Sequence, residues 1–131
     1  MASIPAGFED ILNKKSFVHL ATLMKDGSPQ VSPVWVEYDG THIVINSAKG
    51  RLKDRNMRAD GRVALSATDP ENPYRALMIR GRITKVTEEG ADEHIDSLAK
   101  KYLDQDKYPL RNPDEVRVKY YIEPIKVATM G

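Results

Sequence analysis

Basic side chains gather in one short segment of the sequence, between residues 49 and 62. The segment holds six basic residues against the carboxylates of Asp54 and Asp60, a net charge of +4, whereas the whole chain carries only +1. Gly50 lies where a short helix is expected to begin, and glycine lets the backbone approach a ligand closely. A helix N-terminus with nearby Lys and Arg is a phosphate site by geometry and charge, and a solvated basic face is the equally weighted alternative. The six residues are Lys49, Arg51, Lys53, Arg55, Arg58 and Arg62.

Aromatic residues offer a second kind of chemistry, the binding of a planar group. Tyr74 and Arg75 follow a proline and could flank such a ligand by stacking and by charge, although a turn that enters a strand is the commoner origin of this pattern. Trp35 is the only tryptophan of the chain. It is expected in the core or at an interface, and the wall of an aromatic cofactor is the alternative.

Motifs for catalysis without a cofactor are missing from the sequence. The chain has no cysteine, and its three histidines, His19, His42 and His94, have no metal-ligand spacing, so no metal site is expected. His94 is interpreted as a solvated residue of a helix. No nucleophile elbow, Walker motif or Rossmann glycine motif occurs, so no catalytic residue can be assigned. If the protein is an enzyme, a cofactor carries the chemistry.

The composition is that of one globular domain, and residues 1–131 are treated as a single unit. The chain is 40% apolar and 30% charged, with no run near the ~20 apolar residues of a membrane span. The first ten residues do not resemble a secretory signal, so a cytoplasmic location is expected. A net charge of +1 argues against a general polyanion binder, and the basic segment lacks the aromatic residues typical of nucleic-acid binding.

Hydrophobic periodicity predicts the elements that must position these residues. The first strand is nearly apolar throughout, so burial on both faces is expected. Asp26-Gly27 and Asp39-Gly40 are hairpin signals, Asp69 to Pro73 is expected to be a loop, and Thr87 is a candidate N-cap. Strands are predicted over Phe17–Met24, Gln30–Tyr38, His42–Ser47, Val63–Thr68, Arg75–Val86, Val116–Ile122 and Ile125–Met130, and helices over Gly7–Lys14, Lys49–Arg58 and Gly90–Leu103.

Two residues within the predicted strands indicate irregularities. Pro33 cannot donate to a sheet ladder, which favours an edge or a bulge at that position, and Gly81 suggests a bulge or a close backbone approach. Six or seven mostly antiparallel strands with small peripheral helices predict a mainly β (α+β) fold, a compact β-barrel.

Several motifs, in order, resemble those of the pyridoxamine 5'-phosphate oxidase-like superfamily of flavin and deazaflavin proteins. The resemblance covers residues 8–130 and is strongest to the F420-dependent flavin/deazaflavin oxidoreductases, group B. It implies a split β-barrel and a homodimer with cofactor sites at the subunit interface. The motifs are Asp26-Gly-Ser-Pro-Gln-Val-Ser-Pro-Val34, Ser47-Ala-Lys-Gly-Arg-Leu-Lys-Asp-Arg-Asn56, Arg58-Ala-Asp-Gly-Arg-Val-Ala-Leu65, Asp69-Pro-Glu-Asn-Pro-Tyr-Arg75, Arg80-Gly-Arg82 and Glu93-His-Ile-Asp-Ser-Leu-Ala-Lys-Lys-Tyr-Leu103.

The resemblance also implies which residues bind the cofactor. The phosphate site would contain Ser47, Ala48, Gly50, Arg51 and Lys53, with Asn46 and Lys49 beside them. Gln30, Ser32 and Pro33 would lie along the ring system, Asn56 would brace the loop, and Tyr74 and Arg75 would come from the second subunit. The C-terminal residues 123–131 contain no Arg or His, which argues against pyridoxamine-phosphate oxidation itself.

The leading functional hypothesis is therefore an F420-dependent reductase that transfers a hydride to an activated double bond, such as that of an unsaturated ester or lactone. Solvent or a phenol such as Tyr74 would supply the proton. The basic segment suits F420, whose tail carries more negative charge than FMN. The alternatives are an FMN-dependent oxidase or reductase of the same fold and a non-catalytic protein that carries a flavin or deazaflavin.

Overall fold

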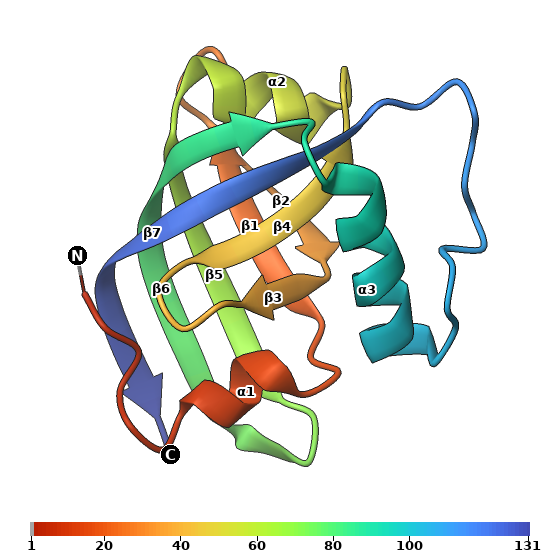
Figure 1. Ribbon diagram of the computed structural model, residues 1–131. Helices are drawn as coiled ribbons and strands as arrows, with labels where there is room; N and C mark the ends of the chain where they lie inside the picture. Colours follow the sequence, from red (N-terminus) through yellow and green to blue (C-terminus); the bar gives the residue numbers. More distant parts are fainter. Residues whose placement is uncertain (1) are drawn as a thin grey trace.

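Seven antiparallel strands and three helices make up the computed structural model, which describes residues 2–131 (Figure 1). The strands form one sheet in the order β2-β1-β5-β6-β7-β4-β3. No helix among the described residues is long and apolar enough to cross a lipid bilayer. The strands are β1 (Val18–Leu23), β2 (Pro29–Val34), β3 (Val36–Tyr38), β4 (Ile43–Ala48), β5 (Arg62–Asp69), β6 (Asn72–Thr87) and β7 (Arg117–Met130), and the helices are α1 (Glu9–Asn13), α2 (Leu52–Ala59) and α3 (Ala91–Leu103).

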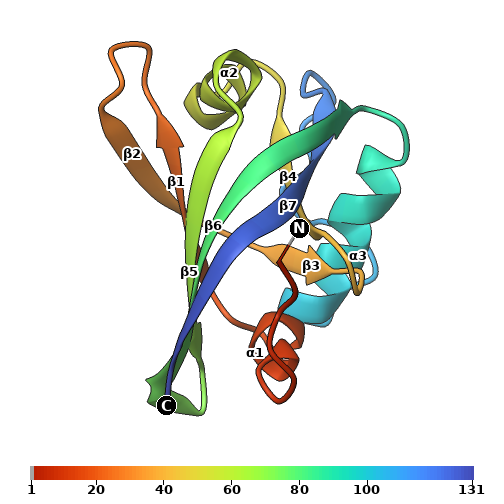
Figure 2. The same ribbon diagram turned by 90° about the vertical axis from the view of Figure 1, so that its left-hand side faces the viewer.

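The two edges of the sheet are consecutive in the chain. Strands β2 and β3 lie at opposite ends of the strand order, yet only Trp35 separates them. The sheet must therefore curl until its edges approach each other, and Figure 2 shows β1 and β2 diverging from the other strands at one end. This is a split β-barrel, the predicted fold class.

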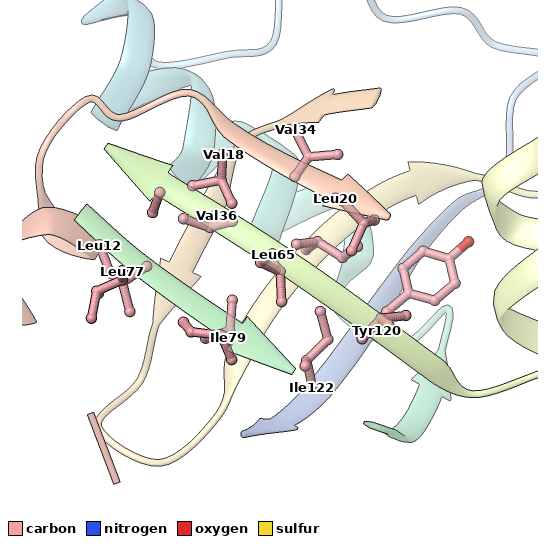
Figure 3. Packing of buried hydrophobic residues seen from close by; sticks show 14 of the residues in the cluster. Leu12, Val18, Leu20, Val34, Val36, Leu65, Leu77, Ile79, Tyr120 and Ile122 are labelled. Carbon is pink, nitrogen blue, oxygen red and sulfur yellow. The ribbon is translucent and has the colours of Figure 1, made fainter. Parts of the chain in front are cut away.

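The core fills the space that the curled sheet encloses. Alternate residues of each strand point inward, as the period of a half-buried strand requires, and Figure 3 shows their side chains packed together. The phenol of Tyr120 is among the largest fully buried side chains. The central members are Leu12, Val18, Leu20, Val34, Val36, Leu65, Leu77, Ile79, Tyr120 and Ile122.

Helix α3 builds a second, smaller apolar cluster outside the barrel. It contacts β7 and β4, and its buried face contains Ile95, Leu98 and Tyr102. The rings of Trp35 and Tyr108 pack against this cluster. The short link between β2 and β3 therefore joins the barrel to the layer beneath α3.

The strand predictions were correct in order and wrong in several boundaries. The break in the predicted strand 30–38 falls at Trp35, whereas Pro33 stays within β2, an edge strand of the sheet. Pro124 does not end a strand, because β7 runs through it and pairs it with Gly81. The predicted loop 69–73 is a two-residue turn, Pro70-Glu71, between β5 and β6.

The prediction that the first strand is buried on both faces was also wrong for the single chain. Val18 and Leu20 are fully buried, but Phe17, just before β1, is 64% exposed, and His19 is exposed as well. The outer face of β1, which includes His19 and Ala21, is thus not covered completely by this chain.

All three helices start later than predicted, and α1 begins at Glu9 rather than Gly7. Helix α2 begins at Leu52 rather than Lys49, because Gly50 adopts a left-handed conformation with φ of 92° and the turn precedes the helix. Helix α3 begins after Gly90, which has φ of 72°, and Thr87 does not cap it. The hydroxyl of Thr87 instead accepts a hydrogen bond from the backbone N–H of Glu89 at 3.1 Å.

The prediction for Gly81 is confirmed. The register between β6 and β7 shifts at this residue, and a Cβ atom there would lie 2.7 Å from Ile122 Cγ2 and 2.9 Å from the carbonyl oxygen of Glu123. Only glycine lets the two long strands approach this closely.

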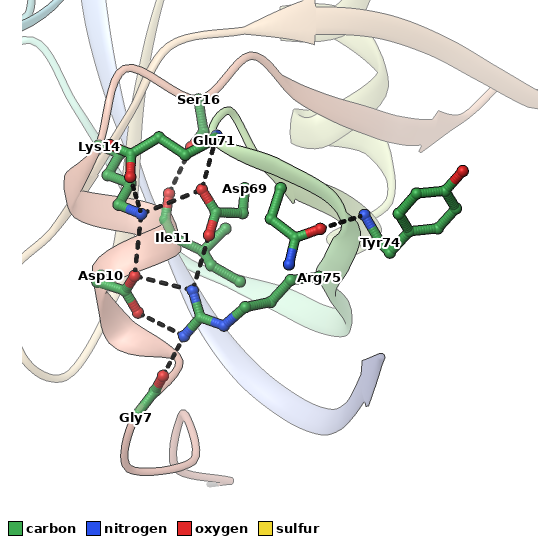
Figure 4. Close-up of polar contacts among 10 residues, drawn as sticks. Gly7, Asp10, Ile11, Lys14, Ser16, Asp69, Glu71, Tyr74 and Arg75 are labelled. Atoms are coloured by element: carbon green, nitrogen blue, oxygen red, sulfur yellow. Dashed lines mark hydrogen bonds and ion pairs between the residues drawn. The ribbon is translucent and has the colours of Figure 1, made fainter. Parts of the chain in front are cut away.

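An ion-pair network ties α1 to the turn between β5 and β6 (Figure 4). The guanidinium of Arg75 binds Asp10 at 2.8 Å and Asp69 at 2.9 Å, and it also donates to the carbonyl of Gly7. Lys14 adds a contact to Asp69 at 3.1 Å. Asp69 is almost completely buried, so these cations are needed to keep its charge stable.

Candidate functional site

A pocket of about 360 Å³ opens between the barrel, the start of α2 and helix α3. One end of it is polar and cationic, and the remaining walls are apolar and aromatic. Arg51 and Lys53 come from the start of α2, Asn46 from β4, and Arg117 from the first position of β7. The other lining residues are Phe17, Pro33, Val34, Trp35, Ile95, Leu98, Leu103, Tyr108 and Leu110.

The cationic end of the pocket has more positive than negative charge. Glu115 accepts hydrogen bonds from Arg51 at 2.7 Å and from Arg117 at 3.1 Å. Lys53 is half-buried, and within residues 2–131 no carboxylate lies at ion-pairing distance from its amine. Arg51 and Arg117 therefore share one carboxylate, and Lys53 has none.

The pKa of Lys53 reflects this imbalance. Burial, followed by repulsion from Arg51 and Arg117, lowers the pKa of its amine below the usual value. An anion bound beside the three cations would reverse that effect, because an opposite charge favours the protonated amine. The arrangement is suited to a phosphate or carboxylate group of a ligand.

The apolar wall is built from stacked rings. Trp35 lies parallel to Tyr102 with a centroid separation of 5.1 Å and an interplanar angle of 6°. Tyr108 meets the same indole edge-on at 6.1 Å. The pocket thus combines a flat aromatic surface with an anion-binding end, which is how binding sites for planar, phosphorylated ligands are built.

Comparison with known proteins agrees with this geometry. The sequence matches the family Pyridoxamine 5'-phosphate oxidase over residues 4–129. The chain belongs to this family. No curated protein sequence matches it.

Solved structures extend the comparison. An F420 reductase is 31% identical, the alignment covers 95% of this chain and 98% of that one, and the TM-score is 0.84. An FAD-binding protein from Mesorhizobium loti (21% identity, 98% and 95% coverage, TM-score 0.71) and a putative pyridoxamine 5'-phosphate oxidase from Listeria innocua (18%, 92% and 93%, TM-score 0.69) share the fold.

The six basic residues between positions 49 and 62 do not form one surface. Only Arg51 and Lys53 line the pocket. Lys49 pairs with Glu88 at 3.4 Å, Arg58 with Asp54 at 2.9 Å and Arg62 with Asp60 at 2.7 Å. The helix is short and the segment turns at both ends, so side chains close in sequence point in different directions.

The turn before α2 is held by a buried carboxylate. Asp54 accepts hydrogen bonds from the backbone N–H of Gly50 at 2.9 Å, from the hydroxyl of Tyr120 and from Arg58. Burial raises the pKa of Asp54, but these hydrogen bonds outweigh it and keep the carboxyl ionised. The N–H of Gly50 is therefore already used within the chain, which leaves side chains to supply most of the binding at this end.

Two hydroxyls predicted for the site are buried without a partner. Ser47 Oγ and Ser32 Oγ make no hydrogen bond within the described residues. Ser47 shares the barrel-interior face of β4 with Ile45, and Ala48 next to it is buried. Neither serine lines the pocket, so their contact with a cofactor remains a prediction.

The other predicted residues divide between the pocket and the scaffold. Pro33 lines the pocket, whereas the amide of Gln30 contacts only the neighbouring carbonyl of Val31 at 3.4 Å. Asn56 donates to Thr22 Oγ1 at 3.0 Å and to Met24 Sδ at 3.4 Å, so it braces α2 against β1.

Tyr74 and Arg75 lie outside this pocket. Figure 1 places the β5–β6 turn at the end of the barrel opposite α2, and Tyr74 is 79% exposed there. Arg75 is engaged by the two carboxylates described above. Their contribution to a second copy's site remains a prediction that the single chain does not test.

Two polar residues near the pocket were not recognised from the sequence. Arg117 enters it from the start of β7, where no motif marks it. His94 is only 7% exposed, so its interpretation as a solvated residue was wrong. Its position between Ala91, Ile95 and Leu98 on the apolar face of α3 was the signal that could have found it.

Proposed function

We propose that the protein is an oxidoreductase that binds reduced F420 in this pocket and reduces an activated double bond of a small organic substrate, such as an unsaturated ester or lactone. The observation that carries the proposal is Lys53, a half-buried cation without a counterion beside two arginines and an aromatic wall. Family membership and the 31% identity to an F420 reductase support it.

The residues present fit such a cofactor. Lys53, Arg51 and Arg117 would bind its anionic group, and Trp35 and Pro33 would contact its ring system. When bound, reduced F420 supplies a hydride, and the substrate takes up that hydride together with a proton from water or a phenol. The chain's own contribution is to bind and orient the cofactor and to exclude water with the apolar walls.

FMN is the second candidate cofactor. Four of the six basic residues between 49 and 62 are paired with carboxylates of the same chain, so fewer free cations remain for the acidic tail of F420. The family is named for pyridoxamine 5'-phosphate oxidase, and a solved structure of the same fold is described as FAD-binding. A phosphate of FMN would use the same Lys53 end of the pocket.

A titration distinguishes the hypotheses of F420 binding and FMN binding. The apo-protein is titrated with F420 and with FMN at equal salt, and binding is followed by the fluorescence of Trp35, the only tryptophan, which lines the pocket. We expect tighter binding of F420 and oxidation of reduced F420 when unsaturated esters or lactones are added. Tighter binding of FMN would favour the second candidate. Binding without turnover across the substrate panel would indicate a carrier.

We also propose that the protein is a homodimer. The resemblance to the group B oxidoreductases supports a second copy, and so does the outer face of the sheet. Val31, Ala21 and Ala64 form an apolar band across β2, β1 and β5, and Met78 pairs with Ala128 in the next row on β6 and β7. The same face also carries His19, Ser66, Arg80 and Lys126. The outer face of an antiparallel sheet that meets water is normally polar.

A further inference from the structure

A chain of polar contacts connects buried His94 to the cationic end of the pocket. Asn46 is its centre: the amide nitrogen Nδ2 lies 2.9 Å from the carbonyl oxygen of Ala91 and 3.1 Å from His94 Nδ1. The amide oxygen Oδ1 accepts a hydrogen bond from Arg117 Nε at 2.8 Å. Three elements, β4, α3 and β7, meet in this chain of contacts.

The chemistry of the partners sets the direction of every hydrogen bond. The carbonyl of Ala91 can only accept, and the guanidinium of Arg117 can only donate, so the Asn46 amide has one possible orientation. Its two N–H groups then point to Ala91 and to His94. His94 Nδ1 must therefore be the acceptor, which places the proton of the neutral imidazole on Nε2.

The surroundings of His94 favour this neutral form. Burial, then the positive charges of Lys119 and Arg117 on β7, lower the pKa of His94 to about 4. The carboxylate of Glu37 on β3 lies 3.1 Å from Nε2 and acts in the opposite direction. Glu37 is about half exposed, so water weakens its effect.

Arg117 is the residue that these contacts hold in place. Its side chain is almost completely buried. Nε binds Asn46 and Nη1 binds Glu115, whereas Nη2 has no hydrogen-bond partner within residues 2–131. The guanidinium also lies 5.4 Å from the ring centroid of Tyr108, another pocket residue. A buried guanidinium with one free edge is a donor prepared for an anion.

We infer that Arg117 is an anion-binding residue of the pocket and that His94 is its positioning residue, because His94 Nδ1 accepts one of the three hydrogen bonds that hold the Asn46 amide, and that amide fixes the guanidinium. The binding role rests on the proposed function, whereas the order of hydrogen bonds does not. Without an acceptor at the Nδ1 position, the second N–H of Asn46 loses its partner, and only Ala91 and Arg117 still hold the amide. The amide, and the guanidinium that it fixes, are then held less firmly.

Two substitutions separate this role from simple packing. His94→Asn can place a carbonyl oxygen near the former Nδ1 position, whereas His94→Leu fills a similar volume without an acceptor. In each variant the affinity for F420 and for FMN is measured at pH 7 by Trp35 fluorescence. We expect His94→Leu to bind at least ten-fold more weakly, and His94→Asn to stay within about three-fold of the wild type. Equal affinities of the two variants would overturn the positioning role.

A measurement without cofactor tests the network itself. In ¹⁵N NMR spectra of the free wild-type protein at pH 7, Nδ1 of His94 should carry no proton, and the Nε–H of Arg117 should exchange slowly with water. That slow exchange should persist in His94→Asn and be lost in His94→Leu. A proton on Nδ1 at pH 7 would refute the inference. If neither cofactor binds the wild type while the NMR results hold, the proposed cofactors fail and the network stands.

A third variant tests the contact between Asn46 and His94 even if His94→Leu does not fold. Asn46→Asp would place a second acceptor against Nδ1, so the imidazole should take up a proton. We expect the pKa of His94, followed by NMR, to rise by at least two units in this variant. An unchanged titration would show that Asn46 does not face Nδ1 as an N–H donor.

Discussion

Lys53 is the residue on which the binding of an anionic cofactor most depends. Replacing it with Met keeps the apolar stem and removes the charge. A charge-assisted hydrogen bond contributes about 1.5–3 kcal/mol, so cofactor affinity should fall roughly ten- to hundred-fold. The melting temperature of the apo-protein should be equal or higher, because burial and the charges of Arg51 and Arg117 disfavour this cation in the free protein.

The matched control for Lys53 is Lys49→Met. Lys49 lies in the same basic segment but pairs with Glu88 on the exposed surface and does not line the pocket. Its replacement should change affinity less than three-fold. Equal losses in the two variants would mean that overall charge, rather than the pocket, attracts the ligand.

The lowered pKa of His94 also predicts that the stability of the protein depends on pH. Its pKa is about 4 in the folded protein and near 6.5 when unfolded, so the unfolded chain binds more protons between these values. Its contribution to stability is therefore complete above pH 6.5 and is lost as the pH falls toward 4. The loss amounts to at most about 3 kcal/mol, and Glu37 reduces it.

Urea unfolding of the wild type and of His94→Asn between pH 4.5 and 7.5 checks this sign. The wild type should lose more free energy of unfolding on acidification than the variant, which has no group that titrates at this position. Parallel curves would mean that His94 is already protonated in the folded state.

At the level of single residues, the sequence predicts what local charge and periodicity reveal. The cation cluster pointed to Lys53 and Arg51, which both reach the pocket. Arg117 lies 64 residues beyond Lys53 in the sequence, and only the pairing of β4 with β7 brings it beside Asn46. Contacts that depend on sheet register leave no local signal.

At the level of elements, the junction between β2 and β3 shapes the pocket, and Tyr102 secures it. The hydroxyl of Tyr102 accepts from the backbone N–H of Val36 at 3.2 Å and donates to the carbonyl of Ser16 at 2.7 Å. Lys101 next to it donates to the carbonyls of Leu12 and Val36. Helix α3 is thereby fixed to α1, to the segment before β1 and to β3.

Tyr102→Phe tests this anchor. The variant keeps the ring that stacks on Trp35 but leaves the buried N–H of Val36 and the buried carbonyl of Ser16 without this partner. We therefore expect a loss of about 1–3 kcal/mol in the free energy of unfolding. Tyr38→Phe is the control, because its hydroxyl binds the exposed carbonyl of Gly40 and should contribute less than about 0.5 kcal/mol. Urea titration measures both, and similar losses would contradict the anchoring role.

The elements themselves were largely predictable, since strong periodicity and Asp-Gly turns mark most of them. The errors arose where tertiary structure overrides a local signal. Pro124 stays within β7 because the register shift at Gly81 accommodates a residue without an N–H donor. The break at Trp35 has no turn residue, and it is set by closure of the barrel.

At the level of the whole molecule, the exposed apolar residues on the outer face of the sheet are the feature that a single chain does not explain. Val31 is 61% exposed and Met78 38%, and they share this face with alanines of β1, β5 and β7 as well as with Arg80 and Lys126. The apolar pattern of the first strand predicted burial on both faces, and a second copy would supply the missing cover. A two-fold dimer requires such a self-complementary patch, with about 800 Å² buried on each partner.

Sedimentation at micromolar concentration should therefore show a species of twice the 14.7 kDa chain mass. Val31→Glu places a charge at the β2 end of the band and should weaken the dimer, because a charge buried without a partner costs free energy. The control is Glu93→Lys, on the exposed side of α3 and away from the band. It changes the net charge by more than Val31→Glu does but should leave the dimer intact. The resemblance to the group B oxidoreductases implies that the second subunit contributes residues to the cofactor site. The Val31→Glu monomer should therefore bind the cofactor more weakly. It should keep the slowly exchanging Arg117 Nε–H signal, because the pocket itself is formed within one chain. A wild type that sediments only as a monomer would rule out a two-chain site, and the pocket beneath α3 would then have to bind the cofactor alone.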